Sequence, residues 1–409
     1  MRNTEISEIR LMSDIETIAG WTESDPAAGY DRPTFSPSWK SARDYVIEEA
    51  RKLGCSVRTD PIGNVHARPS DLSWDEPAWL CGSHIDTVPS GGKFDGVVGV
   101  VVALELLRTR PKAALELVIF AEEEGTTFGI AMLGSRAWAG TIEIEQIRKL
   151  KNRAGIDIVT AGKALGVAPD MIRAGSFGFP LGRYKGLLEV HVEQGLGLWK
   201  KGLPAAVVTT VNGRRQYSGQ FQGVANHAGS TAMSDRFDAL AGAAELILGL
   251  EALGREIDRV HPGSTLTTGA LTVSPNAVNV VPGRADFMLD FRSPSNEALA
   301  SGDGSIRQLL SSIGEKRGLQ TRIECFENLP ALPFDPGLCD RLRKAGAELG
   351  ILLPDASSGA LHDSAILAPF LPTAMIFVAS KDGISHNPAE FSRPEDIAAA
   401  ACVVAAAIA

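Results

Sequence analysis

Residues 82–96, GSHIDTVPSGGKFDG, lie between two apolar segments and decide the interpretation of the fold. The apolar run at residues 78–81 before them predicts a buried strand, and the apolar run at residues 97–107 after them predicts a packed helix. Gly91, Gly92 and Gly96 permit sharp turns of the backbone between the two. The stretch is therefore expected to be a strand end, a loop and a helix start, which is where open α/β sheets bind their ligands.

Three side chains of this stretch are candidates for holding or orienting a metal ion. His84 and Asp86 are two positions apart, so in an extended backbone they point to the same side. A metal-bound histidine usually donates its other ring proton to an acceptor, often a carboxylate. Asp86 could instead ligate or cap the loop, and Asp95 follows the glycine turn, where its two oxygens could bridge two ions. The alternative interpretation is a solvated turn rich in glycine and aspartate.

A second acidic segment follows the next predicted strand. Residues 114–121 form a mostly apolar run that ends in Glu122, Glu123 and Glu124. Three adjacent carboxylates at a strand end repel one another unless a positive charge lies among them. A metal ion would supply that charge, and an acidic loop in water is the alternative.

Residues 186–195 place a histidine in an alternating pattern. Apolar residues at 188, 190 and 192 alternate with Glu189, His191 and Glu193, which predicts a strand. If the polar face of this strand is buried, it needs a physical reason, and metal ligation by His191 is one. An exposed edge strand is the alternative.

Length, composition and charge exclude several classes of protein. A length of 409 residues with 44% hydrophobic residues suits two or three domains with substantial cores. The net charge of −9 and the pI near 5.4 argue against a nucleic-acid partner and against an anionic membrane surface. No apolar run is long enough to span a bilayer, and the N-terminus has no apolar core of a secretory signal. Five scattered cysteines without a Cys-x-x-Cys pair predict reduced thiols and a cytoplasmic protein.

The middle of the chain has the pattern of a second domain. Strands are expected at residues 214–221, 264–273, 284–291 and 320–324, with helices at 235–253, capped by Ser234, and at 297–313. This order predicts a ferredoxin-like unit, which we expect to be inserted as residues 207–324 between the two parts of an α/β domain, residues 1–206 and 325–409. In those parts, further helices are expected at 38–53, 131–139, 142–150, 159–165, 168–174, 338–349 and from about 394, and a strand at 373–378.

Six motifs together resemble a known family. Residues 82–96, 122–125, 191–195, 226–229, 279–283 and 385–388, in this order over nearly the whole chain, are similar to those of the metal-dependent amidases of the peptidase M20 clan. Within the clan, the form His191-x-Glu193-Gln194-Gly195 resembles the hydantoinase/carbamoylase branch, because related peptidases usually offer a carboxylate there. That branch includes N-carbamoyl-L-amino-acid hydrolases, allantoate amidohydrolases and β-ureidopropionases.

The resemblance implies a fold, a metal centre and roles for its residues. The fold would be a mixed-sheet α/β catalytic domain with an inserted ferredoxin-like α+β domain that acts as lid and dimerisation domain, in a homodimer. Two divalent ions would be bound, and mixed histidine and carboxylate ligands fit zinc, manganese, cobalt or nickel without choosing among them. The implied roles are His84, Asp95 and His191 for one ion, Asp95, Glu124 and His386 for the other, Asp86 to orient His84, Glu123 as the general base for water between the ions, and His227 to stabilise the oxyanion, commonly in the partner's site.

The resemblance also implies a substrate. Gln194, Asn279 and Arg292 resemble positions that hold the amide and carboxylate of a ureido acid, the backbone at Gly359-Ala360 would add donors, and His362 would support that wall. The implied reaction is hydrolysis of the ureido C–N bond of N-carbamoyl-L-amino acids, with release of CO2 and ammonia. Allantoate and 3-ureidopropionate are the rival substrates within the branch.

Two other classes remain open, an aminoacylase or peptidase and a metal-binding protein without activity. One departure bears on the choice of substrate. Thr127 stands where the branch usually has an arginine, which leaves the substrate preference of arginine-bearing members in question for this chain.

Overall fold

The computed structural model describes residues 5–169 and 180–409, which form two compact units. The first unit contains the described residues up to Thr209 together with Phe334–Ala356 and Leu361–Ala409, and the second contains Thr210–Pro333 and Ser357–Ala360. The expected boundary at residue 325 falls inside a strand, Gln320–Leu329, which pairs with β7 (Gly213–Gln222) from its first to its last residue, with one shift of register between Cys325 and Glu327. Residues 325–329 therefore belong with the second unit.

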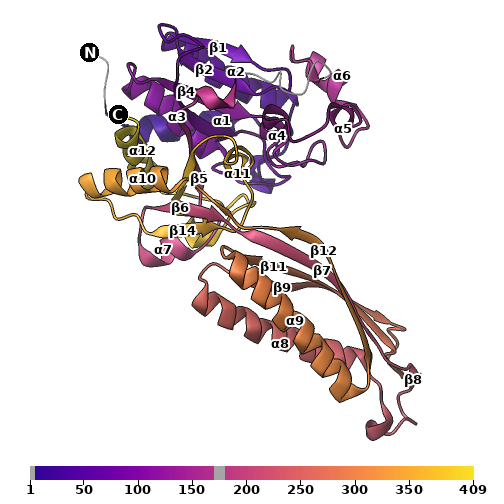
Figure 1. The fold of residues 1–409 in the computed structure, drawn as a ribbon. Helices are drawn as coiled ribbons and strands as arrows, with labels where there is room; N and C mark the ends of the chain where they lie inside the picture. Colours follow the sequence, from indigo (N-terminus) through magenta and orange to yellow (C-terminus); the bar gives the residue numbers. More distant parts are fainter. Residues whose placement is uncertain (1–4, 170–179) are drawn as a thin grey trace. The chain divides into compact units, whose positions relative to one another are not determined.

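Nine strands of the described residues form a mixed sheet, most of which lies in the first unit (Figure 1). Its order is β1-β2-β4-β3-β5-β15-β6-β13, and β14 also pairs with β6. The strands are β1 (Cys55–Thr59), β2 (Val65–Pro69), β3 (Trp79–His84), β4 (Leu115–Phe120), β5 (Gly186–Val192), β6 (Ala205–Val211), β13 (Leu332–Pro333), β14 (Asp355–Ser358) and β15 (Thr373–Val378).

The four central strands of this sheet are parallel. β3 pairs in parallel with β4 and β5, and β5 pairs in parallel with β15. Every residue of these four strands is buried, as is usual for parallel strands covered on both faces. Because parallel strands end at the same edge, the loops that follow β3, β4, β5 and β15 are gathered there.

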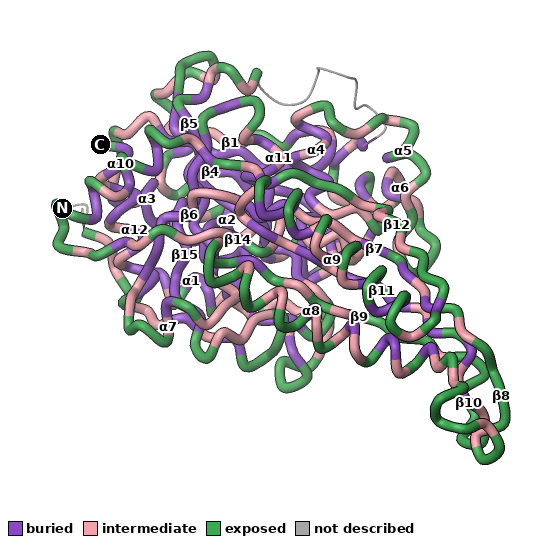
Figure 2. The backbone as a smooth tube through the Cα atoms, turned by 60° about the horizontal axis from the view of Figure 1, so that its bottom comes forward, coloured by how far each residue is buried: buried purple, intermediate pink, exposed green. Residues whose placement is uncertain are grey.

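Helices surround this sheet. They are α1 (Glu8–Ala19), α2 (Pro37–Lys52), α3 (Val97–Thr109), α4 (Leu133–Ala139), α5 (Ile144–Arg148), α6 (Ile158–Lys163), α7 (Gly197–Lys201), α10 (Pro336–Glu348), α11 (Asp363–Leu367) and α12 (Pro394–Ala407). Helix α3 is rich in β-branched valine, which has low helix propensity. It is helical because nearly all its side chains are buried, so packing outweighs propensity. Figure 2 shows this concentration of buried residues around the sheet.

The second unit is a four-stranded antiparallel sheet with two helices on one face (Figure 1). Its strands are β7 (Gly213–Gln222), β9 (Thr265–Ser274), β11 (Arg284–Ser293) and β12 (Gln320–Leu329), and its helices are α8 (Ala239–Val260) and α9 (Asn296–Arg317). The sheet order β12-β7-β11-β9 and the chain order βαββαβ are those of the ferredoxin-like fold. The expected fold class is confirmed. The short strands β8 (Asn226–His227) and β10 (Val280–Val281) pair beside it.

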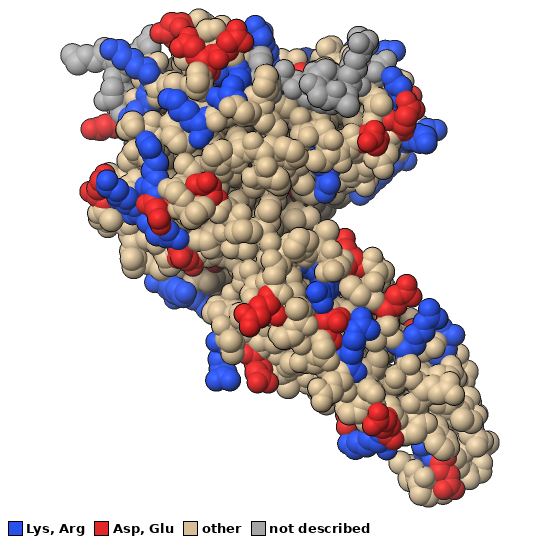
Figure 3. Space-filling view, in the orientation of Figure 1, with Lys and Arg blue, Asp and Glu red and all other residues tan. Residues whose placement is uncertain are grey.

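Aromatic and aliphatic side chains join the helices to the sheet in this unit. Phe221, Phe287 and Phe291 from the strands pack with Leu246 of α8 and Leu310 of α9 in one buried cluster. The outer surface of α8 and α9 carries interspersed charges of both signs (Figure 3), among them the pair between Lys316 Nζ and Glu245 Oε1 at 2.7 Å.

One expected helix cap is wrong, one alternative interpretation is excluded, and one expected helix lies mostly outside the described residues. Helix α8 is capped by Asp238, whose carboxylate accepts the N–H of Ala241 at 3.0 Å, and not by Ser234, because the chain is still extended at Arg236 (φ −87°, ψ 131°). Strand β5 is central and buried, which excludes the edge-strand interpretation. The helix expected at 168–174 falls mostly outside the described residues.

Helix α1 and strand β6 are among the elements that had not been predicted. Leu11, Ile15 and Ile18 of α1 are buried at helical spacing, a signal that was present in the sequence. Among the described helices, none combines the length and apolar character that a membrane crossing demands. All five cysteines, which lie in the described ranges, are free thiols.

Candidate metal centre

The candidate ligands of the first unit converge at the carboxyl edge of the parallel strands. His84 is the last residue of β3, and His191 is the penultimate residue of β5. Glu124 lies in the loop after β4, and His386 lies in the loop between β15 and α12. Asp95 lies just before α3, at the end of the glycine loop. Four segments that are distant in sequence thus contribute to one cluster.

Asp95 lies at the middle of this cluster. Its Oδ1 is 3.1 Å from His191 Nε2 and 3.6 Å from His84 Nε2. Its Oδ2 is 3.3 Å from His386 Nε2, which is in turn 3.8 Å from Glu124 Oε2. The geometry gives two groups of potential ligands that share Asp95, namely His84–Asp95–His191 and Asp95–Glu124–His386. A carboxylate whose two oxygens face different imidazoles could bridge two cations, which two-metal sites hold about 3.5–4 Å apart.

The chemistry of the cluster fits divalent cations. His84 Nε2 and Glu124 Oε1 are buried and have no hydrogen-bond partner, although buried polar atoms are normally paired. Burial and the neighbouring Asp95 raise the pKa of Glu124 to about 7, and burial raises the pKa of Glu123 well above its usual range. Burial would also raise the pKa of Asp95, but the surrounding histidines hold it well below its usual range. Cations among these carboxylates would satisfy the unpaired atoms and relieve the repulsion.

Asp86 contacts the centre in two ways. The Nδ1 of His84 lies 3.0 Å from the backbone carbonyl of Asp86, whereas the Asp86 carboxylate is 3.7 Å away. The carboxylate instead accepts the backbone N–H groups of Glu123 at 3.3 Å and Glu124 at 3.1 Å. Asp86 therefore orients the His84 ring through its main chain and holds the Glu123–Glu124 loop through its side chain.

The three consecutive glutamates have different surroundings. Glu122 has a positive φ of 58°, and its Oε1 accepts the N–H groups of Thr127 at 2.9 Å and Phe128 at 2.6 Å. Its side chain thus closes the turn of the loop. Glu123 has its Oε2 3.7 Å from His84 Nε2, beyond hydrogen-bonding distance. Glu123 and Glu124 are the two that belong to the cluster.

A glycine at position 96 is required by the centre. Gly96 has φ +66°, and a Cβ there would lie 2.4 Å from His84 Nε2. No side chain fits this space without displacing the imidazole. Gly96 of the sequence motif therefore permits the turn and also leaves the space that the His84 ring occupies.

Gln194 and His362 also lie at the cluster. Gln194 Nε2 donates to Asp95 Oδ2 at 2.7 Å and lies 3.4 Å from His386 Nε2. The buried His362 ring packs 4.5 Å from the ring of His191. Burial, and then the charge of His191, lower the pKa of His362 well below its usual range, which favours the neutral ring.

The other expected site residues lie in the second unit. His227 and Asn279 are exposed, and the His227 Nδ1 accepts the N–H of Gly229 at 3.0 Å. Arg292 donates from Nε to Asp290 Oδ1 at 2.7 Å and from Nη1 to the carbonyl of Gly359 at 2.7 Å. The N–H of Ala360 donates to Ser358 Oγ at 3.2 Å.

Sequence reasoning missed several buried polar residues that support the cluster. Glu390 accepts the N–H of Asp95, and Glu189 accepts a hydrogen bond from Ser83 Oγ at 2.7 Å and from the backbone of Ser364 at 3.2 Å. The buried Asp363 accepts from Ser135 Oγ. Glu189 was visible as part of the polar face of β5, but a lone acid in a loop, such as Glu390, carries no pattern that distinguishes it from a surface residue.

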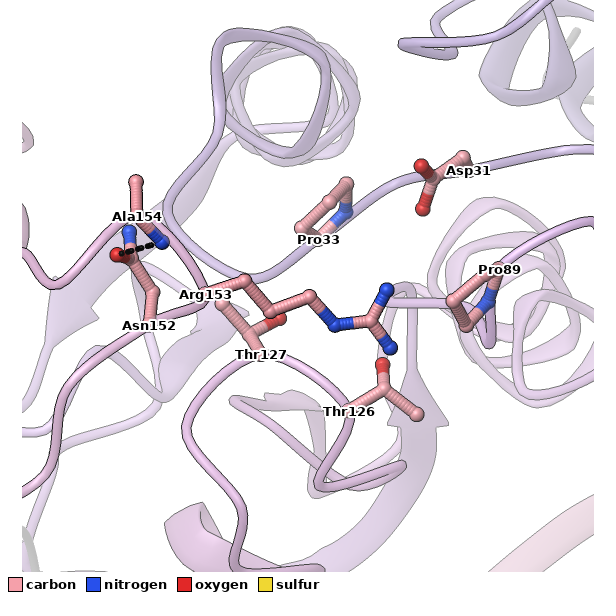
Figure 4. Close-up of a pocket in the computed structure, with 8 residues that line it drawn as sticks. All are labelled: Asp31, Pro33, Pro89, Thr126, Thr127, Asn152, Arg153 and Ala154. Atoms are coloured by element: carbon pink, nitrogen blue, oxygen red, sulfur yellow. Dashed lines mark hydrogen bonds between the residues drawn. The ribbon is translucent and has the colours of Figure 1, made fainter.

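A cavity of about 230 Å³ adjoins the loop that follows Glu124 (Figure 4). Thr126, Thr127 and Pro89 line one part of it, and the Arg153 side chain extends into it toward Thr126. The Oγ1 of Thr127 accepts the N–H of Thr34 at 3.0 Å. Arg153 thus places a cation in the cavity that Thr127, the departure from the family motif, helps to line.

Comparisons with known proteins agree with this geometry. Residues 80–409 match the model of peptidase family M20/M25/M40. The chain is 33% identical to the N-carbamoyl-L-amino-acid amidohydrolase of Paenarthrobacter aurescens, over 95% of this chain and 94% of that protein. It is 32% identical to the allantoate amidohydrolase of Bacillus subtilis, over 89% and 88% of the two chains.

A solved structure is similar over nearly the whole chain. The amidase of the hydantoinase/carbamoylase family from Burkholderia multivorans has a TM-score of 0.90 and 33% identity, over 99% of this chain and 98% of that one. Sequence, fold and ligand cluster lead to one conclusion: the chain belongs to peptidase family M20/M25/M40, in its hydantoinase/carbamoylase branch.

Proposed function

We propose that this protein is a metal-dependent amidohydrolase that cleaves the ureido C–N bond of N-carbamoyl-L-amino acids, with release of CO2 and ammonia. The observation that carries the proposal is the position of Asp95, whose two oxygens face His84 and His191 on one side and His386 on the other. The activity named for the Paenarthrobacter aurescens relative supports the choice of substrate.

Two divalent cations would be held by the two ligand groups that share Asp95. Zinc, manganese, cobalt and nickel all suit imidazole and carboxylate donors. Such ions, when bound, lower the pKa of water from 15.7 to roughly 7 and polarise the substrate carbonyl.

Glu123 is the proposed general base. Its side chain is nearly buried, with 7% of the residue exposed, and its backbone is held by the Asp86 carboxylate. A carboxylate with a raised pKa takes a proton from the attacking water and passes it to the leaving nitrogen more readily than an ordinary one. The same group can therefore serve both proton transfers of the hydrolysis.

Substrate contacts are proposed for residues of both units. Gln194 would hold the ureido group, and Asn279 and Arg292 would hold the carboxylate, with backbone donors at Gly359-Ala360. Arg292 has five N–H groups and uses three of them within the described residues, on Asp290 and Gly359, which leaves two for a carboxylate.

His227 would donate to the oxyanion, in the site of the partner of a homodimer. The second unit, Thr210–Pro333 with Ser357–Ala360, would then act as lid and dimerisation domain. His362, which is buried and packed on the ring of His191, would support the wall of the site.

The test is an activity panel with controlled metal content. Protein depleted of metal is reconstituted with zinc, manganese, cobalt or nickel and assayed for ammonia with N-carbamoyl-L- and D-amino acids, allantoate, 3-ureidopropionate and N-acetyl amino acids. We expect metal-dependent ammonia release from N-carbamoyl-L-amino acids. No ammonia from any ureido acid with any metal would refute the proposal, and free amino acid from the N-acetyl compounds without ammonia would favour an aminoacylase.

Allantoate is the second candidate, since a relative of nearly equal identity is an allantoate amidohydrolase. Higher kcat/KM for allantoate than for every N-carbamoyl-L-amino acid in the same panel would select it.

A further inference from the structure

Glu390 joins the two loops that carry Asp95 and His386. It is 3% exposed, and its Oε2 accepts the backbone N–H of Phe94 at 2.8 Å and that of Asp95 at 3.0 Å. Its Oε1 accepts the hydroxyl of Ser385, the residue before His386, at 2.8 Å. One carboxylate therefore binds the main chain of one ligand loop and the side chain of the other.

Gly92 and two aromatic rings surround the side chain of Glu390. At Gly92 a Cβ would lie 2.1 Å from Glu390 Oε2 and 2.6 Å from Glu390 Cβ, so only glycine leaves room for the carboxylate. The rings of Phe94 and Phe391 pack edge to face at 5.7 Å beside it. The side chain is thus held in one place from both loops.

Ser385 completes the connection. Its hydroxyl also lies 3.1 Å from Asp95 Oδ2, the oxygen that faces His386. A hydroxyl has one proton, so the Glu390 and Asp95 carboxylates compete for the same donor. The orientation of the shared aspartate is therefore coupled to the position of Glu390.

We propose that Glu390 is a positioning residue that sets the affinity of the cation held by Asp95, Glu124 and His386. The inference rests on the metal centre of the proposed function. Residues that hydrogen-bond to metal ligands typically contribute 10–100-fold to metal affinity.

The two ligand groups differ in how far they depend on Glu390. His84 and His191 lie on buried central strands, whose ladders fix them independently. His386 lies in a loop at φ 53°, with 48% of its side chain exposed. Loss of Glu390 should therefore displace His386 relative to Asp95 and leave His84 and His191 in place.

The experiment measures cation binding to the metal-depleted full chain by titration calorimetry with Zn²⁺ and Co²⁺. His386→Ala and His84→Ala first identify which binding step belongs to which ligand group. We expect Glu390→Ala to weaken the step that His386→Ala abolishes by about 10–100-fold. The other step, which shares Asp95 but keeps His84 and His191 on their strands, should weaken by a clearly smaller factor. Glu390→Gln, whose amide oxygen can still accept both backbone N–H groups, should restore most of the affinity.

Glu105→Ala is the matched control, because Glu105 is a fully buried carboxylate that accepts the N–H of Ser7 at 2.9 Å far along α3. It should leave both binding steps unchanged even if it lowers stability. If Glu390→Ala does not fold, Glu390→Asp withdraws the carboxylate by one methylene and gives the same comparison.

Unchanged affinity at both steps, or an equal loss at both, would overturn the inference. Two binding steps without turnover of any ureido acid would refute the proposed function and leave this inference standing.

Discussion

Replacing Glu123 by glutamine separates a proton-transferring role from a ligand role. The amide keeps the size of the side chain but cannot take a proton at neutral pH. The substitution also breaks little in the structure. Residue 123 keeps both of its backbone hydrogen bonds, the one that its N–H donates to Asp86 and the one that its carbonyl accepts from the N–H of Met132 at 2.7 Å. The Oε2 of Glu123 lies 3.7 Å from His84 Nε2, so no hydrogen bond is lost there.

The expected loss is therefore almost entirely in catalysis. General acid–base catalysis contributes typically 10²–10⁴-fold, so kcat of Glu123→Gln should fall by that factor, or about 3–5 kcal/mol of transition-state stabilisation. Cation affinity and the unfolding midpoint should stay close to those of the unmodified protein. The assay is ammonia release at saturating metal, with calorimetric cation binding on the same samples.

Glu122→Gln is the control for this experiment. Glu122 is adjacent in sequence, is 1% exposed and hydrogen-bonds to the loop backbone rather than to the cluster. Its amide oxygen can still accept the Thr127 and Phe128 N–H groups, so kcat should remain within a few-fold. Retention of more than a tenth of kcat in Glu123→Gln would refute the general-base assignment. Weakened cation binding in the calorimetry would show instead that Glu123 is a ligand.

Three further predictions concern Gly96, the buried Asp60 in the loop between β1 and β2, and Arg153 in the cavity. Gly96→Ala should lower cation affinity at least tenfold in calorimetry, because the new Cβ would lie 2.4 Å from His84 Nε2 and would displace the ring. Unchanged affinity would show that His84 is not a ligand. Burial raises the pKa of Asp60 from 3.8 to about 6, so the folded state holds this proton more tightly than the unfolded state does. The folded protein should therefore become less stable as the pH rises from about 4 to about 6, by about 3 kcal/mol in the free energy of unfolding. Asp60→Asn should remove this loss in urea titrations between pH 4 and 7, and parallel pH curves for the two proteins would contradict it. Arg153→Gln should raise KM for N-carbamoyl-L-glutamate more than for N-carbamoyl-L-leucine, because Arg153 is the cation in the cavity beside the Glu124 loop; equal changes would show that the substrate side chain does not enter this cavity.

Much of the architecture follows from local patterns. The buried strand at Thr373–Val378 and the βαββαβ order of the second unit were predicted, because apolar runs and alternation depend on short-range geometry. Helix boundaries were less predictable. A cap depends on where the preceding chain stops being extended, and this placed the start of α8 at Asp238 rather than Ser234.

The candidate ligands were recognisable in the sequence because histidines and carboxylates at strand ends, in a glycine-rich context, form motifs. What the sequence alone determined is which residues are candidates for the chemistry and which strands and helices present them. The tertiary structure decided which of these residues meet. Strand β5 is central rather than at an edge, and Glu390 binds the backbone of Asp95 across nearly 300 positions of chain. Contacts of this range depend on the order of strands in the sheet and on the space left by glycines such as Gly92, and neither is encoded within a local stretch of sequence.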